Sequence, residues 1–312
     1  MRATTPWVLI GILVLTGTAR AAAPAQPIIT DPLLPENAVR QVSPHVHVIM
    51  GFPNVGIIVG DTGVLVVDTG LGARNGALVA RAAKKLSAKG QRLYLTTTHF
   101  HPEHAAGQDG FPPGTTVIRP KVQQMELETE GPRMIALFSG RNPLMRSLLQ
   151  GARIGKADVL FERELDLDLG GVEARLLNLG AAHTRGDELI FVPEDGVLLS
   201  GDVVQNEISP NIICASCSPR QWIAVLDRVA PLAPKLIVPD HGGLGGNELI
   251  GEERAFLVDL EDRALALERQ GKSSAEAGRL IAAELGRKYA GWQNLRNIPQ
   301  SVERAYADAG AP

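Results

Sequence analysis

Three of the seven histidines of this chain fall within six residues, shortly after an expected strand over 92–97. The segment reads Thr-His-Phe-His-Pro-Glu-His and places its histidines at His99, His101 and His104. Imidazole is costly to bury without a partner, and it is the commonest side-chain ligand of transition metals. On an extended segment His99 and His101 project to one side, and a turn after Pro102 brings His104 round to a neighbouring direction. The cluster therefore predicts two adjacent metal ions.

This segment is similar to the His-x-His-x-Asp-His signature of the metallo-β-lactamase superfamily, with Glu103 where the family usually has aspartate. Further landmarks of the family occur in the expected order along residues 45–243. The resemblance implies an α/β fold, namely an αββα sandwich whose loops converge on the metals at one edge. The landmarks are Val-Val-Asp-Thr-Gly at 66–70, Ala-His-Thr-Arg-Gly-Asp at 182–187, Ser-Gly-Asp at 200–202 and Val-Pro-Asp-His-Gly-Gly at 238–243.

The resemblance implies two metal sites that share the carboxylate of Asp202. We expect two zinc ions, although iron or manganese also suits such donors. Asp68 would end an early strand and orient the ligands through hydrogen bonds without binding metal. His45 and His47 match no motif and are expected on the face of a strand. The implied ligands are His99, His101 and His183 for the first ion, and His104, His241, Asp202 and Glu103 for the second.

Glu103 departs from the family pattern by one methylene group. That group moves the carboxylate outward by about one carbon–carbon bond, whereas metal–ligand distances tolerate only ~0.2 Å. Glu103 can reach the second metal after a small loop shift, act as a general acid or base beside it, or leave the site weak. We favour the first alternative, because His104, Asp202 and His241 are all present. Glu103, Asp68 and Asp202 are the three carboxylates that we expect to act in catalysis.

The implied reaction is hydrolysis of a small molecule. A bridged pair of divalent ions lowers the pKa of a shared water, so that hydroxide can attack the carbonyl of a β-lactam-like cyclic amide, lactone or ester. The sequence has no Gly-x-Ser-x-Gly elbow, which argues against a serine α/β-hydrolase. Asp202 is typical of family members that cleave thioesters, lactones or phosphoesters, whereas antibiotic-hydrolysing members usually have Cys or Ser there. The alternatives are an iron-dependent oxygenase or redox protein, and an accessory binding protein with an impaired second site.

The first 21 residues resemble a secretory signal peptide. Arg2 precedes the apolar run 7–15, which is too short to span a bilayer comfortably, and Ala19 and Ala21 match a signal-peptidase site. An uncleaved N-terminal anchor is the alternative. We expect export, to the periplasm, with no stable membrane association after cleavage. The net charge of −3 indicates no nucleic-acid partner.

The only two cysteines are Cys214 and Cys217. After export they are expected to form a local disulfide. The alternatives are a pair of idle thiols and half of a zinc-binding set, but no second Cys-x-x-Cys exists to complete such a set.

Apolar runs separated by turn signals divide the mature chain into successive elements. An extended lead-in over 22–41 precedes a domain over 42–248, with ordered structure beginning near Val42. Strands are expected at 46–49, 55–59 and 64–67, then a helix over 73–89 with Gly90 as its C-cap, then a strand over 92–97 that delivers the histidines. A second hairpin, 189–192 with 197–202, mirrors the first, and both end in an aspartate.

Residues 120–156 are partly amphipathic and predict helix, either packed in the core, which we favour, or inserted over the site. Residues 249–312 form a helical C-terminal extension, with helices at 252–269, 274–286 and 302–309. Trp292 is expected to anchor this packing, and a substrate-lining role is the alternative.

Overall fold

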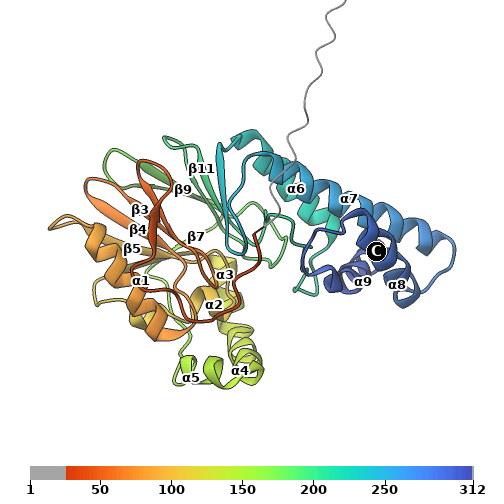
Figure 1. Cartoon of the computed structure of the whole chain (residues 1–312), viewed down its shortest axis with the longest axis horizontal. Helices are drawn as coiled ribbons and strands as arrows, with labels where there is room; N and C mark the ends of the chain where they lie inside the picture. Colours follow the sequence, from red (N-terminus) through yellow and green to blue (C-terminus); the bar gives the residue numbers. More distant parts are fainter. Residues whose placement is uncertain (1–25, 311–312) are drawn as a thin grey trace, which may run out of the picture.

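Two β-sheets pack face to face in the computed structural model, which describes residues 26–310 (Figure 1). The first sheet has seven strands in chain order: β1 (Val39–Gln41), β2 (Val46–Ile49), β3 (Val55–Val59), β4 (Gly63–Val67), β5 (Arg92–Thr96), β6 (Thr116–Pro120) and β7 (Val159–Phe161). The second has five strands in the order β12 (Leu236–Pro239), β11 (Val197–Gly201), β10 (Leu189–Val192), β9 (Glu173–Leu177) and β8 (Glu164–Asp168).

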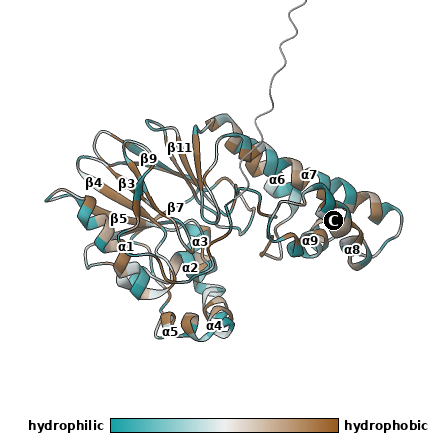
Figure 2. Ribbon diagram, viewed as in Figure 1, coloured by the Kyte–Doolittle hydropathy of each residue, from teal (hydrophilic) through white to brown (hydrophobic). Residues whose placement is uncertain are grey.

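The space between the sheets is the main apolar core. Ile58 and Leu65 of the first sheet belong to one buried cluster with Ile190 and Leu199 of the second. Because side chains alternate along a strand, the neighbouring residue Ile57 faces the opposite side, where helix α1 packs. Figure 2 shows that most of the ribbon of the central strands has the colour of hydrophobic residues.

Helices cover both outer faces, which completes the αββα sandwich predicted from the sequence. Helix α1 (Gly72–Leu86) packs on the first sheet through Val79 and Ala83. Helix α6 (Pro219–Val229) packs on the second sheet through Trp222 and Leu226, together with the first half of α7.

Two local boundaries differ from the sequence prediction. Helix α1 ends at Leu86, and Ser87 is its C-cap in extended conformation. Gly90 has a φ of 92°, but it lies in the turn before β5 and does not cap the helix. The ordered lead-in also starts before Val42, because β1 pairs with β2 and Leu34 is buried against the first sheet.

Three helices between β6 and β7 form a separate apolar cluster beside the histidine segment. Met134 and Phe138 are buried there with Phe100. The helices are α3 (Lys121–Thr129), α4 (Gly131–Arg141) and α5 (Pro143–Leu148), and the short α2 (Pro102–Ala105) packs against α4.

The C-terminal helices are α7 (Glu248–Arg269), α8 (Ser274–Lys288) and α9 (Ile298–Ala309), and they share a core of their own. Trp292 stacks on Phe256 with ring centroids 4.9 Å apart, which confirms its predicted packing role. Leu249 and Leu257 of α7 belong to the sandwich core, so this helix joins the extension to the domain. Between residues 26 and 310, no helix is long and apolar enough to cross a membrane. The predicted signal peptide lies outside these residues.

Candidate metal centre

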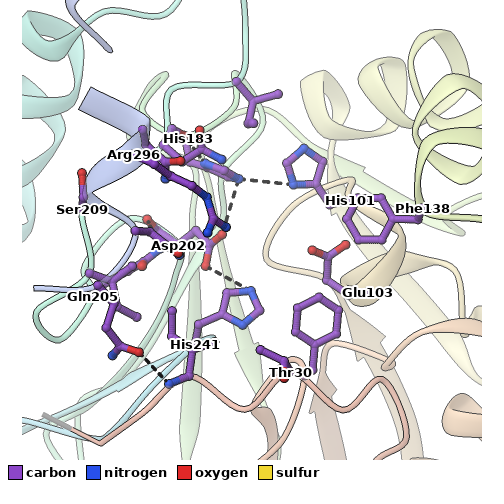
Figure 3. A pocket seen from close by; sticks show the side chains of 18 of the residues that line it. Thr30, His101, Glu103, Phe138, His183, Asp202, Gln205, Ser209, His241 and Arg296 are labelled. Atoms are coloured by element: carbon purple, nitrogen blue, oxygen red, sulfur yellow. Dashed lines mark hydrogen bonds and ion pairs between the residues drawn. The ribbon is translucent and has the colours of Figure 1, made fainter. Parts of the chain in front are cut away.

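The predicted metal ligands meet at one edge of the sandwich. The pairs β4–β5 and β11–β12 are each parallel, so the carboxyl ends of both strands in a pair lie at the same edge. Asp68 follows β4 and Asp202 follows β11, while His241 comes after β12. The histidine segment follows β5, and His183 lies in the loop between β9 and β10. Every predicted site residue is therefore in this region. Figure 3 shows those that border the cavity: His101, Glu103, His183, Asp202 and His241.

The first donor set consists of His99, His101 and His183, all buried. Nε2 of His99 is 2.9 Å from Nδ1 of His101, which is 3.2 Å from Nε2 of His183. Tetrahedral zinc with bonds of ~2.05 Å to nitrogen holds its ligand atoms roughly 3.3 Å apart, so this spacing fits one ion. Burial lowers the pKa of all three, and the neighbouring histidines lower it further. A lowered pKa favours the neutral imidazole, which is the state that binds metal.

The second donor set consists of Glu103, His104 and His241, whose ligand atoms lie within 4.8 Å of one another. Oε1 of Glu103 is 3.9 Å from Nε2 of His104. Glu103 reaches this position because His101 is the N-cap of α2 and Pro102 starts the helix, which turns the next side chain inward. Burial raises the pKa of Glu103 to about 7, although the charge of His104 opposes the shift. The longer side chain is thus compatible with a second ion.

Asp202 lies between the two sets. Its Oδ2 is 3.4 Å from Nε2 of His183, and its Oδ1 is 3.7 Å from Nε2 of His241. Burial by itself would raise the pKa of Asp202, but the charges of His241 and His183 hold it below its ordinary value. An ionised carboxylate that touches one histidine of each set has the position expected of a bridging ligand (Figure 3).

Several buried donor atoms of this centre have no hydrogen-bond partner among the described residues: Glu103 Oε2, His104 Nε2 and Asp202 Oδ1. Buried polar atoms are nearly always partnered in native proteins. Divalent cations would satisfy these atoms, and a set of imidazole and carboxylate donors suits zinc, manganese or iron.

A layer of hydrogen bonds behind the ligands fixes their orientation. Nδ1 of His104 lies 2.9 Å from Oδ2 of Asp68 and 3.2 Å from Oδ2 of Asp240. Burial alone would lower the pKa of His104, but these two carboxylates raise it well above its ordinary value. Thr98 donates its backbone N–H to Asp68 and its hydroxyl to Asp240. Asp68 thus lies where a hydrogen bond can orient the ring of His104.

The sequence assigned no role to Asp240, Thr98 or Asn211. Asp240 directly precedes a predicted ligand at the end of β12, and that position was the one available signal. The backbone carbonyl of Asn211 contacts Nδ1 of His183. Because every residue has such a carbonyl, the residue type gives no signal for this contact. His45 and His47 lie outside the metal centre: His47 is on β2 and His45 directly precedes that strand, where its Nδ1 is 2.8 Å from Oδ1 of Asp195.

Cys214 and Cys217 form the predicted disulfide, with their Cα atoms 5.3 Å apart. The alternative of a zinc-binding pair is therefore wrong. The disulfide closes the loop that supports His183, because the backbone N–H of Ile213 donates to the His183 carbonyl over 3.2 Å.

The metal centre opens into a cavity of about 740 Å³. Helix α4 supplies one wall through Met134, Leu137 and Phe138, so the segment 120–156 covers the site as well as packing in the core. The C-terminal extension supplies another wall through Arg296 and Arg304. The lead-in also takes part, since Ile28 and Thr30 line the cavity. Trp292 does not line it, so its alternative role is not seen.

Curated proteins with sequences similar to this chain include an alkylsulfatase and a metallo-beta-lactamase. The linear primary-alkylsulfatase of Pseudomonas sp. (strain ATCC 19151) is 23% identical over 222 residues, which is 61% of this chain and 42% of that protein. The metallo-beta-lactamase type 2 of Bacteroides fragilis is 27% identical over 93 residues, which is 29% of this chain and 37% of that protein. The chain spans less than half the length of these relatives.

Solved structures share the fold at lower identity. A stereoselective inverting sec-alkylsulfatase from Pseudomonas sp. matches with a TM-score of 0.66 and 20% identity, over 86% of this chain and 50% of that one. A metallo-beta-lactamase from Pontibacter korlensis matches with a TM-score of 0.56 and 18% identity, over 70% of this chain and 98% of that one.

The family model for the metallo-beta-lactamase superfamily matches residues 48–241, which is more than half of the chain. This range contains every predicted metal ligand, and the members of the superfamily are metal-dependent hydrolases. The chain therefore belongs to the metallo-β-lactamase superfamily.

Proposed function

We propose that this protein is a two-metal hydrolase that attacks the carbonyl of a cyclic amide, lactone or ester in a small molecule. The observation that supports it is the arrangement of two buried donor sets around Asp202, at the base of one cavity of about 740 Å³. A cavity of this volume accommodates a small organic substrate.

In this proposal His99, His101 and His183 would hold the first ion, Glu103, His104 and His241 would hold the second, and Asp202 would serve both. Bound divalent ions would supply activation of water and stabilisation of negative charge on the substrate. The protein's own contribution is orientation: Asp68 and Asp240 fix the ring of His104, and the Asn211 carbonyl fixes that of His183. We propose zinc as the metal.

A second candidate is hydrolysis of an alkyl sulfate. The sec-alkylsulfatase structure matches 86% of this chain, whereas the Pontibacter metallo-beta-lactamase matches 70%. The linear primary-alkylsulfatase is also similar over 222 residues. The apolar side chains of α4 beside the metal centre suit an alkyl group.

We further propose that the protein works after export, in the periplasm. The Cys214–Cys217 disulfide supports this location, because disulfides persist in oxidising compartments. Expression with and without residues 1–21, followed by fractionation and N-terminal sequencing, tests it. Retention of the full-length protein in the cytoplasm would contradict export.

The test of the reaction uses purified protein whose metal content is measured, then stripped and reloaded with zinc, manganese or iron. β-Lactams, lactones, thioesters, phosphoesters and alkyl sulfates are assayed in parallel. We expect two equivalents of zinc and turnover of one carbonyl substrate class, both lost in His101→Ala. Turnover of alkyl sulfates alone would favour the second candidate. Activity only with iron would favour an oxygenase or redox protein, and no turnover with two ions bound would favour an accessory binding protein.

A further inference from the structure

The cavity above the metal centre has an excess of positive charge. Four arginines line it, on two different walls: Arg133 and Arg141 of α4, and Arg296 and Arg304 of the C-terminal extension. Among residues 26–310, the only carboxylates that line it are Glu103 and Asp202, and both belong to the donor sets. Once cations occupy those sets, the remaining charge of the lining is cationic.

Arg141 ends α4 next to the metal centre. Its guanidinium carbon lies 3.5 Å from the centre of the Phe138 ring, and its charge influences the pKa of both His101 and Glu103. Burial lowers the pKa of Arg141 itself, against the pull of Glu103, but an arginine remains charged at neutral pH. Within residues 26–310 it makes no hydrogen bond or ion pair. Its donors are therefore available to a ligand.

Arg296 stands on the opposite wall, in the short 3-10 helix Leu295–Asn297 before α9. Figure 3 shows its side chain extending toward Asp202 and His183, across the cavity from Phe138. Among the described side chains none pairs with its guanidinium. Farther along the same wall, Nε of Arg304 is buried and has no hydrogen-bond partner. Arg133 differs from these three, because Glu130 already pairs with it at 3.2 Å.

A guanidinium without a partner on a cavity wall is matched by an oxyanion, which accepts two of its N–H groups at once. The same cavity has an apolar side. Leu137 is 51% exposed there, although a leucine usually faces a core, and Phe138 and Phe52 lie nearby. Charge on two walls and an apolar strip on α4 together describe a ligand with an anionic group and a hydrocarbon part.

We infer that the cavity selects an amphiphilic substrate whose oxyanion, a carboxylate or a sulfate, is held by Arg296 and Arg141 while its apolar part lies along α4. This deepens the proposed function, since it concerns the same site. It predicts that neutral analogues of a substrate bind poorly.

Binding of ligands that cannot be hydrolysed tests this without relying on turnover. Octanesulfonate, octanoate and the neutral octyl glucoside, each below its micellar concentration, are titrated calorimetrically into zinc-loaded protein. The variants are Arg296→Gln and Arg141→Gln, with Arg279→Gln as the matched control. Arg279 is exposed on α8 and lines none of the cavities described, so this control removes one charge from the same extension.

We expect both anions to bind at least tenfold more tightly than octyl glucoside, and the sulfonate-to-carboxylate ratio to identify the preferred oxyanion. Arg296→Gln and Arg141→Gln should each weaken anion binding about tenfold, the size typical of a charge-assisted hydrogen bond. Arg296→Lys should recover part of the loss, and Arg279→Gln should bind like the wild type. Equal affinity of the wild type for neutral and anionic ligands would overturn the inference. It would also be overturned if Arg296→Gln and Arg141→Gln bound the anions as tightly as Arg279→Gln, with the melting temperature unchanged in all three variants.

The test of anion binding and the test of the proposed hydrolysis can fail independently of each other. Arginine-dependent anion binding without turnover of any tested class would contradict the hydrolase and leave the inference standing. Equal kcat/KM for a carboxylate-bearing ester and its neutral counterpart, unchanged in both arginine variants, would confirm a hydrolase and contradict the inference.

Discussion

The two β-hairpins β3–β4 and β10–β11 have the same local structure and end in carboxylates with different surroundings. Each hairpin is antiparallel, each second strand has a parallel neighbour, and each ends directly before an aspartate, Asp68 or Asp202. Asp68 is completely buried and binds Thr98 and His104. Asp202 lines the cavity and contacts one histidine of each donor set.

The difference arises at the strand ends. Asp68 itself has a φ of 71°, and its side chain turns back under the histidine segment. In the second hairpin the left-handed residue is Gly201, with a φ of 60°, and the pairing of β11 with β12 shifts register between Leu199 and Gly201. Asp202 follows that irregularity and enters the cavity. The same motif thus supplies a supporting carboxylate in one half of the molecule and a candidate ligand in the other.

The largest effect should come from Asp202→Ala. Loss of the shared carboxylate should reduce bound zinc from two equivalents toward one and lower kcat by roughly a thousandfold, or ~4 kcal/mol of barrier. Metal analysis and steady-state kinetics measure both. Asp262→Ala, an exposed position on α7, is the control and should behave like the wild type. Wild-type zinc content in Asp202→Ala would refute the bridging role.

Asp68→Asn should have an intermediate effect. The amide has the shape of the carboxylate but lacks its charge, so the His104 ring is held less firmly and is a weaker base. Loss of such an outer hydrogen bond typically costs roughly 10- to 100-fold in metal affinity. Competition with a zinc chelator measures it. If affinity were unchanged, Asp68 would be a structural residue without influence on the metal.

Substitution of Glu103 tests whether a second metal ion binds beside Asp202. Glu103→Gln removes the charge and should weaken the second zinc about tenfold or more, because a neutral amide is a poor zinc ligand. Glu103→Asp restores the family residue and should keep two equivalents. Zinc titration followed by calorimetry distinguishes the two steps. Identical stoichiometry and rate in Gln, Asp and wild-type proteins would show that Glu103 is not a ligand.

The smallest effect concerns the turns of the two hairpins. Asp195, in the turn of β10–β11, accepts hydrogen bonds from Ser43 and from the backbone N–H of His45, whereas the side chain of Asp61 in the turn of β3–β4 makes none within the described chain. Asp195→Asn should therefore lower the free energy of unfolding by about 1 kcal/mol, and Asp61→Asn should leave it unchanged. Urea denaturation compares them.

The same pair predicts a pH dependence. Burial by itself would raise the pKa of Asp195, but the hydrogen bonds from Ser43 and His45 hold it below its ordinary value of 3.8. A carboxyl whose pKa is lower in the folded state contributes stability above its unfolded pKa, and the contribution disappears as the pH falls through the folded pKa. The difference between wild type and Asp195→Asn should therefore be present at neutral pH and vanish in strong acid. If the difference in the free energy of unfolding were independent of pH, the shape of the Asp195 side chain and not its charge would account for the stabilisation.

Much of this architecture follows from local patterns. Continuous apolar runs bounded by turn signals predicted the strands of both hairpins, because a strand that is buried on both faces is apolar along its length. Helical periodicity predicted α1, α7 and α8, because burial of one face of a helix sets that period. The end of α1 was missed, since Ser87 stops the helix three residues before the conspicuous glycine Gly90. For residues 120–156, core packing and a position over the site were predicted as alternatives, whereas α4 combines the two. Amphipathicity indicates that a face is buried, but it does not tell whether the opposite face meets solvent or a cavity.

The sequence by itself determined the donor types and their order along the chain, because metal ligation needs particular side chains and the family motifs keep them in order. Only the tertiary structure decided which carboxylate meets which histidine, and that Arg141 and Arg296 line one cavity although they are far apart in sequence. These contacts depend on which strand ends share an edge and on how the C-terminal helices pack, and no local pattern encodes either.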